Sequence, residues 1–117
     1  MAELRVVRHT NRFEECCQFY GEVLGWPITK RWDEPSPGRI YGYGDSARIE
    51  LMQSTQATPL SGAYISVEVD NAKAMYDIMQ MSGVAVTQPL AEQPWGHRNF
   101  GVEDPAGMTI VFFEVLV

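Results

Sequence analysis

Cations and long apolar runs are both scarce in this sequence. Nine lysines and arginines face fifteen aspartates and glutamates, so the formal net charge is −6. A chain with this balance repels the phosphates of nucleic acids, which disfavours DNA or RNA as a partner. The longest apolar run near the carboxyl end, Thr109 to Val117, contains Glu114 and is far too short to span a bilayer. We therefore expect neither a nucleic-acid partner nor a membrane partner.

Cysteine is also rare, and its two copies are adjacent. Cys16 and Cys17 cannot bridge each other within a helix without distortion, and there is no third cysteine. Both fall in the middle of a predicted helix, away from the amino-terminal dipole that would activate a thiol. The first residues, MAELRVVRH, lack the apolar core of a secretion signal. These features favour a reducing, cytoplasmic location, and they give little support to cysteine catalysis.

What is present is the composition of one soluble domain. The chain has 117 residues, of which 45% are hydrophobic and 21% charged, and these proportions are typical of a globular protein rather than a disordered one. We expect residues 1–117 to form a single domain with its own core.

The first half predicts one strand, one helix and three further strands. A strand opens at Leu4, and Asn11 with Glu14 has the spacing of a helix cap and its partner. Apolar residues at helical spacing then predict a helix over 12–24, which Gly25 ends. The three strands that follow are expected at 26–32, 39–43 and 47–52.

The second half repeats this order. A strand is expected at 63–69, and Asp70 is the expected cap of a helix over 71–82 that Gly83 ends. A strand at 84–87 and a loop at 89–96, which holds two prolines, come next. The final hairpin is expected to pair residues 97–102 with 108–115.

Two landmarks recur at nearly the same interval. Gly25 and Gly83 lie 58 positions apart, and the hairpin turns at Asp45 and Asp104 lie 59 apart. This spacing predicts a duplicated unit, with modules at 1–57 and 62–117 joined by a polar connector. The predicted fold is therefore α+β, with two βαβββ modules forming a curved mixed sheet and the helices on its convex face.

Several short motifs occur in a characteristic order over residues 3–115. They are Phe19-Tyr20-Gly21-Glu22-Val23-Leu24-Gly25-Trp26, Ile65-Ser66-Val67-Glu68-Val69-Asp70, Gln93-Pro94-Trp95-Gly96, Arg98-Asn99-Phe100, Asp104-Pro105-Ala106-Gly107 and Phe112-Phe113-Glu114. Together they resemble the vicinal-oxygen-chelate superfamily, which includes glyoxalase I, extradiol dioxygenases, and fosfomycin- and bleomycin-resistance proteins. The resemblance implies the two-module fold described above.

Metal-dependent members of that superfamily hold one divalent ion at four positions. The resemblance places these positions on Arg5, Glu50, Tyr64 and Val111, of which only Glu50 is a good ligand. We therefore expect no metal cofactor, and we expect Arg5 to pair with Glu50 and to matter more for stability than a surface arginine.

A shifted assignment of the metal positions would place them on His9, Glu50, His97 and Glu114. With that assignment, one divalent ion is the alternative cofactor. The shifted assignment conflicts with the ~13 Å of strand that separates positions 5 and 9.

Because it lacks most of these metal ligands, the chain resembles the ligand-binding branch of the superfamily, to which the bleomycin-resistance proteins belong. That resemblance implies a homodimer with a hydrophobic cleft, a planar or cationic small organic ligand, and a role in drug sequestration rather than catalysis. The alternatives are a metal-dependent lyase, isomerase or dioxygenase of the same superfamily, and a module that only dimerises.

Ten residues form the expected ligand site, and no catalytic residue is assigned. They are Arg5, Trp32, Tyr41, Tyr43, Glu50, Tyr64, Trp95, His97, Asn99 and Phe113. Aromatic faces stack on planar ligands and attract cations, and alternation places His97 and Asn99 on one face of a strand with Arg98 on the other. The competing interpretation is that most of the aromatic residues, Phe100 included, fill the core and that His97 and Asn99 are merely solvated. We expect Glu114 to face solvent.

Overall fold

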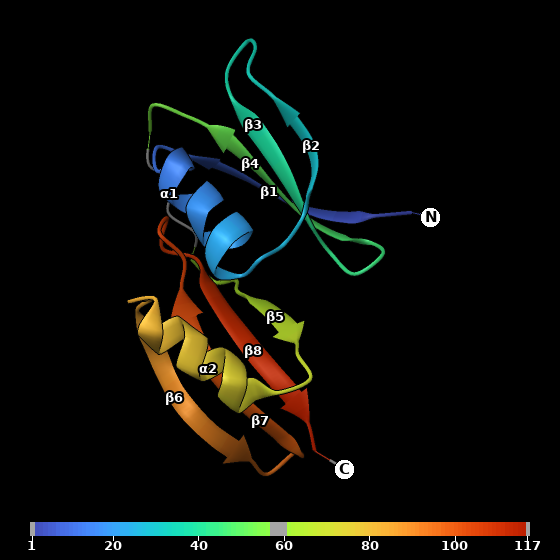
Figure 1. The fold of residues 1–117 in the computed structure, drawn as a ribbon, viewed down its shortest axis with the longest axis vertical. Helices are drawn as coiled ribbons and strands as arrows, with labels where there is room; N and C mark the ends of the chain where they lie inside the picture. The colour runs from blue at the N-terminus through green and yellow to red at the C-terminus, as the bar shows by residue number, and fades with distance from the viewer. Residues whose placement is uncertain (1, 57–60, 117) are drawn as a thin grey trace. The chain divides into compact units, whose positions relative to one another are not determined.

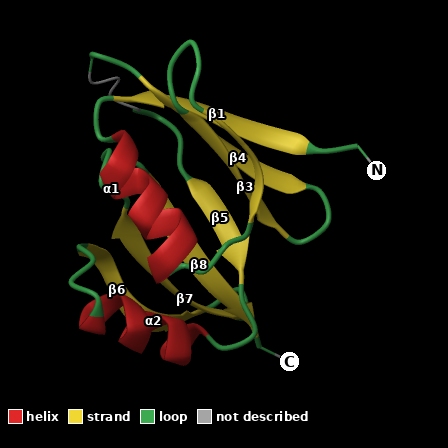
Figure 2. Cartoon of the chain, turned by 45° about the horizontal axis from the view of Figure 1, so that its top comes forward, coloured by secondary structure: helices red, strands yellow, loops and turns green. Residues whose placement is uncertain are grey.

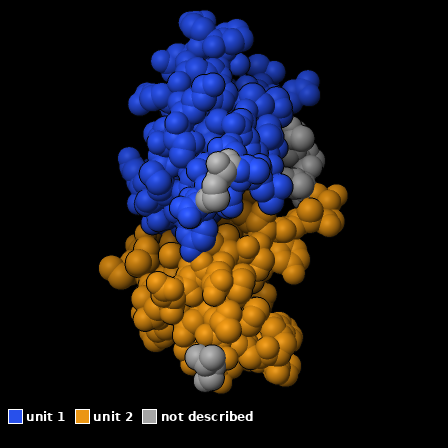
Figure 3. Space-filling view, turned by 90° about the vertical axis from the view of Figure 1, so that its right-hand side faces the viewer, with its two compact units in different colours: residues 1–58 blue, residues 59–117 orange. Residues whose placement is uncertain are grey.

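The computed structural model describes residues 2–56 and 61–116 and divides into two compact units, residues 1–58 and 59–117 (Figure 3). Residues 57–60 of the expected connector lie outside the described residues. Each unit contains one helical segment and a four-stranded mixed sheet, and neither sheet closes into a barrel in the described part of the chain (Figure 1). The predicted α+β fold of two βαβββ modules is confirmed.

The first unit runs in the predicted order. Its elements are β1 (Leu4–Thr10), α1 (Phe13–Gln18), the π-helical turn η1 (Phe19–Val23), β2 (Ile28–Trp32), β3 (Gly38–Tyr43) and β4 (Ala47–Gln53). The strands lie in the order β1-β4-β3-β2, with β1 parallel to β4 and the other pairs antiparallel.

The second unit repeats this topology. Its elements are β5 (Ile65–Glu68), α2 (Ala72–Met81), β6 (Val86–Gln93), β7 (His97–Glu103) and β8 (Thr109–Val115). The strand order is β5-β8-β7-β6, with β5 parallel to β8. Figure 2 shows one helix per unit against the strands. No helix among the described residues is both long and apolar enough to cross a membrane.

Each sheet has one face covered by its own helix and one that this helix leaves open. On β4 the inward residues Ile49 and Leu51 are buried under α1, whereas Arg48, Glu50 and Met52 alternate onto the other face. In the second unit α2 packs over β6, β7 and β8. The buried apolar side chains there are Val67, Ala72, Met79, Phe100, Val102, Met108, Ile110 and Phe112. Burial of each large apolar side chain contributes about 1.5–3 kcal/mol, so the covered faces hold the core of each unit.

The first helix begins one residue later than expected. Its N-cap is Arg12, without a side-chain cap, so the predicted cap at Asn11 is wrong. The Arg12 N–H instead donates to the hydroxyl of buried Thr10, which ends β1. At Phe19 the helix widens into a π turn, and the added Cβ of an alanine at Gly21 would lie 3.0 Å from Tyr41 Cε1. Glycine here lets the tyrosine pack directly on the helix.

The second helix is capped by Asn71, so the prediction of Asp70 is wrong by one residue. The Asn71 backbone is extended and its side chain accepts a hydrogen bond from the Ala74 N–H at 3.0 Å. Glu114 of β8 accepts from the Ala72 N–H at 2.9 Å. Glu114 was expected to face solvent, but its side chain is only 21% exposed because it serves this helix end.

Strand β6 replaces most of the loop predicted at 89–96. It continues through Pro89 to Gln93, with irregular register between Val86 and Ala91. Because β6 is an edge strand, the missing N–H of Pro89 costs no ladder hydrogen bond. The Asp104 turn is as predicted, since its carboxylate accepts from the N–H groups of Ala106 and Met108, both at 2.9 Å.

Candidate functional site

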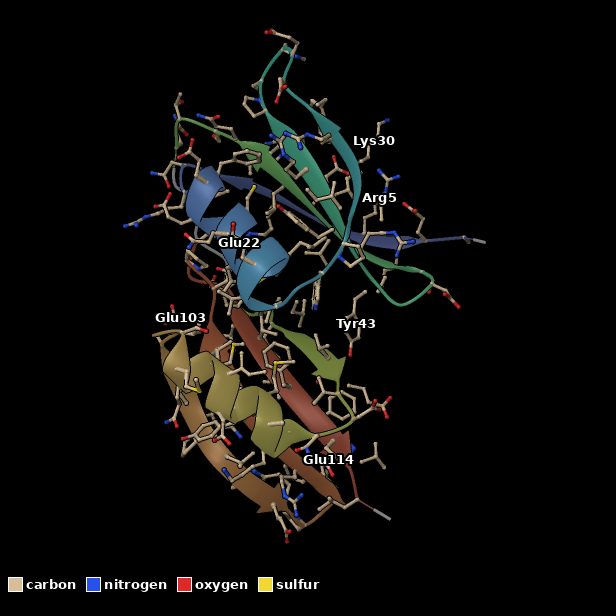
Figure 4. The ribbon with its side chains drawn as sticks, in the orientation of Figure 1. Arg5, Glu22, Lys30, Tyr43, Glu103 and Glu114 are labelled. Carbon is tan, nitrogen blue, oxygen red and sulfur yellow. The ribbon has the colours of Figure 1, made fainter. Side chains whose placement is uncertain are left out.

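The open face of the first unit is built from charged pairs. In register, Arg5 of β1 lies beside Arg48, and alternation puts Glu50 on the same face. Arg5 Nη1 lies 3.1 Å from Glu50 Oε1, and Arg5 Nε lies 2.6 Å from Glu3 Oε2. The predicted pairing of Arg5 with Glu50 is confirmed. Figure 4 shows Arg5 on the side of the sheet away from Glu22 of the helix.

These contacts shift two pKa values in opposite directions. The hydrogen bond from Arg5 lowers the pKa of the Glu3 carboxyl, and hydrogen bonds to Glu3 and Glu50 raise the pKa of Arg5. The Arg5 side chain is 45% exposed and that of Glu50 14%. The pair is therefore partly solvated on the arginine side and mostly buried on the glutamate side. The expectation that Arg5 matters more for stability than a surface arginine stays a prediction.

Trp32 shares this open face, but two predicted wall residues do not. Trp32 pairs with Gly38, and a Cβ added to that glycine would lie 2.1 Å from the indole Cζ2, so the ring lies directly over the glycine. Tyr41 and Tyr43 pair with Ile49 and Ala47 and so face the covered side.

Tyr41 belongs to the core of the first unit, and Tyr43 is half-buried. The Tyr41 ring is 3% exposed and lies 6.3 Å from that of Tyr20, and its hydroxyl donates to the Cys17 carbonyl at 3.2 Å. The Tyr43 ring lies 5.0 Å from that of Trp26. The assignment of Tyr41 to the ligand site is corrected, because pairing register decides the face of a strand residue and aromatic character does not. The assignment of Tyr43 stays a prediction.

The open face of the second unit is aromatic and amide-rich. The rings of His97 and Phe113 stack at 4.6 Å with an interplanar angle of 15°. Asn99 pairs directly with Phe113 in register and lies on the same face as His97, as predicted. The Asn99 carbonyl oxygen accepts from Gln88 Nε2 at 3.2 Å and from Gln93 Nε2 at 3.1 Å.

Two further predicted residues of the second unit are strongly exposed, and one aromatic is not. Tyr64 is 64% exposed and Trp95, in the β6–β7 turn, 63%. Phe100 is fully buried against Phe112, so the core interpretation holds for it. Gln88 and Gln93 were missed, because the loop predicted over β6 hid the alternation that puts both on the open face.

A cavity of about 460 Å³ lies within the first unit and was not predicted. Its lining residues are Phe13, Glu14, Cys17, Gln18, Glu22, Asp33, Pro37, Arg39 and Gln53. The Arg39 guanidinium lies over the Phe13 ring at 5.6 Å, and burial raises the pKa of the Cys17 thiol. The cavity lies between α1 and the β2–β3 loop. No motif in the sequence indicates that these two segments lie together.

Comparison with known proteins places the chain in a family. The family model for the glyoxalase/bleomycin resistance protein/dioxygenase superfamily matches residues 4–112. The chain belongs to this superfamily. A lactoylglutathione lyase of Neisseria meningitidis serogroup A is 32% identical over 97% of this chain and 91% of its own length.

Two solved structures have a similar fold. TioX from Micromonospora sp. ML1 has a TM-score of 0.80 at 18% identity, covering 97% of this chain and 98% of its own. TnmS3, an antibiotic-binding protein from Streptomyces sp. CB03234, has a TM-score of 0.77 at 20% identity, covering 97% and 94%. At these identities the likeness concerns the fold alone.

The residues that the resemblance assigns to a divalent ion have side chains that do not suit a metal within either unit. The Glu50 carboxylate is held by the Arg5 guanidinium, whose charge opposes a cation. In the second unit the corresponding residues are Tyr64 and aliphatic Val111. Within either unit, the described residues contain no group of three or more histidine, cysteine, aspartate or glutamate side chains placed to hold an ion.

The alternative metal set is not assembled either. In the second unit His97 pairs with Val115 on the open face, whereas Glu114 pairs with Arg98 on the covered face. The Glu114 carboxylate is also occupied by the Ala72 N–H and lies 3.6 Å from Arg98 Nη1. Two ligands on opposite faces of one sheet cannot share an ion, so this prediction is wrong.

Proposed function

We propose that the chain is a metal-independent small-molecule-binding protein, cytoplasmic and homodimeric, that sequesters an organic ligand such as a drug. The observation that carries the proposal is the Arg5–Glu50 pair, with 3.1 Å between Nη1 and Oε1. An arginine at a superfamily metal position supplies the positive charge that the ion supplies elsewhere. Lewis-acid chemistry at this position would require displacement of the guanidinium from Glu50.

The second unit supplies a surface suited to a ligand. The stacked His97 and Phe113 rings form a flat platform, and Tyr64 and Trp95 add exposed aromatic area in the same unit. A flat apolar area with a few placed polar groups is the usual composition of a small-molecule site. The antibiotic-binding TnmS3 has the same fold, which is consistent with this use of it.

Charge favours a cationic or neutral ligand over an anionic one. Residues 61–116 carry two cationic side chains, Lys73 and Arg98, against seven aspartates and glutamates. The field of the second unit therefore attracts cations and repels anions. A planar organic cation fits both the platform and the charge.

Similarity to an enzyme supports a second candidate function. A relative described as a lactoylglutathione lyase is 32% identical over nearly the whole chain, so a lyase of this superfamily remains the alternative. That activity would draw on a divalent ion, and the residues at the superfamily positions of each unit do not provide for one.

Thermal unfolding separates the two functions. Ligand at a hundred times its Kd stabilises a protein by about 2.7 kcal/mol, which a dye-free fluorescence melt resolves. The metal-stripped protein should gain Tm from planar cations and nothing from Ni²⁺, Zn²⁺ or Mn²⁺. A gain with metal, together with turnover to lactoylglutathione, would replace the proposal with the lyase. No gain from any compound would leave a module that only dimerises.

A further inference from the structure

Asn99 is a buried amide whose carbonyl is already satisfied. The residue is 6% exposed, and its oxygen accepts from two glutamines of the same neighbouring strand, Gln88 at 3.2 Å and Gln93 at 3.1 Å. A carbonyl oxygen has two lone pairs, so these two bonds complete it. They also fix which way the amide points.

The nitrogen of the same amide is left to donate. Oxygen and nitrogen diverge from one trigonal carbon, so an oxygen turned toward β6 turns Nδ2 away from it, toward the side of β8. There the cross-strand neighbour of Asn99 is Phe113, whose ring stacks with His97. No hydrogen bond from Asn99 Nδ2 to another side chain or to the backbone is formed within the described residues. Among the described residues, the fully buried side-chain nitrogens and oxygens without a hydrogen-bond partner include Arg48 Nε but not Asn99 Nδ2, so this nitrogen stays accessible and can donate to a molecule that approaches the open face.

We propose that the side-chain nitrogen of Asn99 donates a hydrogen bond to an acceptor atom of the ligand. The ligand class is a planar aromatic molecule that stacks on the His97–Phe113 pair and presents a carbonyl-type oxygen at its edge to Asn99 Nδ2. This rests on the proposed function and deepens it by naming the ligand chemistry. Gln88 and Gln93 act as positioning residues, because they hold the amide in its donating orientation without touching the ligand.

The charge of the unit selects among acceptors. A carboxylate or phosphate would also accept from Asn99, but the second unit has five more acidic than basic side chains. Neutral ketone or amide oxygens satisfy the donor without that repulsion. A compound with a neutral carbonyl and a remote ammonium group combines the two preferences.

A matched probe pair tests the hydrogen bond directly. 2-(Aminomethyl)fluorenone and 2-(aminomethyl)fluorene share ring, shape and charge, and differ in a carbonyl against a methylene. In calorimetric titration with EDTA present, the wild-type protein should bind the fluorenone about five- to tenfold more tightly, the worth of one hydrogen bond. The side-chain amide pair of Asn99 in a ¹H–¹⁵N spectrum should shift downfield with the fluorenone only.

Variants separate the amide from general packing. Asn99→Leu should abolish the preference by weakening fluorenone binding alone. If that variant does not fold, Gln93→Leu should shrink the preference by freeing the amide to rotate. Gln80→Leu is its control, since it removes a glutamine that bonds Tyr76 on α2 and should leave the preference intact.

The outcomes of these experiments test the role of Asn99 separately from the proposed metal-independent binding function. Equal binding of the two probes, or a preference that survives Asn99→Leu, would overturn the role of Asn99 while leaving metal-free binding in place. Failure of both probes at millimolar concentration would overturn the planar-acceptor class, whereas the proposed function would still be judged by the compound screen. Fluorenone binding that needs added metal would overturn both.

Discussion

The two units of this chain share one topology and differ in charge and in the chemistry of their open faces. The described part of the first unit carries seven basic and eight acidic side chains, whereas residues 61–116 carry two and seven. The first open face is occupied by ion pairs around Arg5 and by Trp32 over Gly38. The second carries the stacked rings of His97 and Phe113 and the Asn99 amide, which two hydrogen bonds hold in place.

This difference shows which residues determine the fold and which can vary without changing it. Both units bury the alternate residues of their central strands under one helix, such as Ile49 and Leu51 in β4 and Ile110 and Phe112 in β8. The residues between them vary from Arg48 and Glu50 to Val111 and Phe113 without altering the strand order. The covered faces therefore maintain the fold, whereas the chemistry of the open faces differs between the units.

The largest difference in stability should appear between two neighbouring residues of β8 that lie on opposite faces of the sheet. Phe112→Ala removes a fully buried ring and should lower the free energy of unfolding by about 3–5 kcal/mol. Phe113→Ala, one residue on and on the open face, should cost about 1 kcal/mol but weaken ligand binding. Urea denaturation and ligand titration measure the two effects. Equal losses of stability would show that the faces are not distinct in the way described.

A glycine on the open face of the first unit should be the next most sensitive position. Gly38→Ala puts a Cβ 2.1 Å from Trp32 Cζ2, so the indole must leave its place. The expected cost is about 1–3 kcal/mol, with a red shift of tryptophan emission. Gly101→Ala in the second unit meets its nearest atom at 3.2 Å and should cost less. An unshifted spectrum for Gly38→Ala would contradict the position of Trp32.

The helix caps should give a smaller difference. Asn71 accepts a hydrogen bond at the start of α2, so Asn71→Ala should cost about 1 kcal/mol. Asp70→Ala is the matched control and should change little. The first helix has no side-chain cap at Arg12, so an Asn11→Ala variant should also be near neutral. A larger effect of Asp70 than of Asn71 would restore the cap inferred from sequence.

The smallest effect is expected at the ion pairs. Arg5→Ala leaves the mostly buried Glu50 carboxylate without its partner, so it should lower Tm more than Arg12→Ala, which breaks an exposed pair with Glu15. Equal shifts in Tm would contradict the Arg5–Glu50 contact.

The pKa of the Glu3 carboxyl is lowered in the folded state. Its stabilising contribution is therefore present above the ordinary value of 4.5 and is lost as pH falls below it. Glu3→Gln should flatten that part of a pH–Tm profile. A profile unchanged by the substitution would contradict the contact with Arg5.

Local signals in the sequence predicted the order of elements well. Helix-ending glycines and strand alternation act within a few residues, so both units and the Asp104 turn could be anticipated. Pairing register acts between strands distant in sequence, which is why the sequence did not show that Tyr41 lies in the core. The caps at Arg12 and Asn71 depended on single-residue backbone geometry that a pattern does not resolve.

The site could be anticipated in part for the same reasons. Arg5 and Glu50 followed from motif counting, and His97 with Asn99 followed from alternation along one strand. Gln88 and Gln93 did not, because Pro89 between them is a loop signal unless the strand is known to lie at an edge. The stacking of His97 on Phe113 required the register of β7 with β8.

Metal-free binding is tested most directly by calorimetry on one protein sample. The tightest compound from a screen of planar cations is titrated into chelator-stripped protein, and again after addition of Ni²⁺ or Zn²⁺. The Arg5–Glu50 pair predicts the same Kd and stoichiometry in both titrations. Binding that vanishes with EDTA and returns with the metal would contradict the account and make the protein a metalloenzyme of its superfamily.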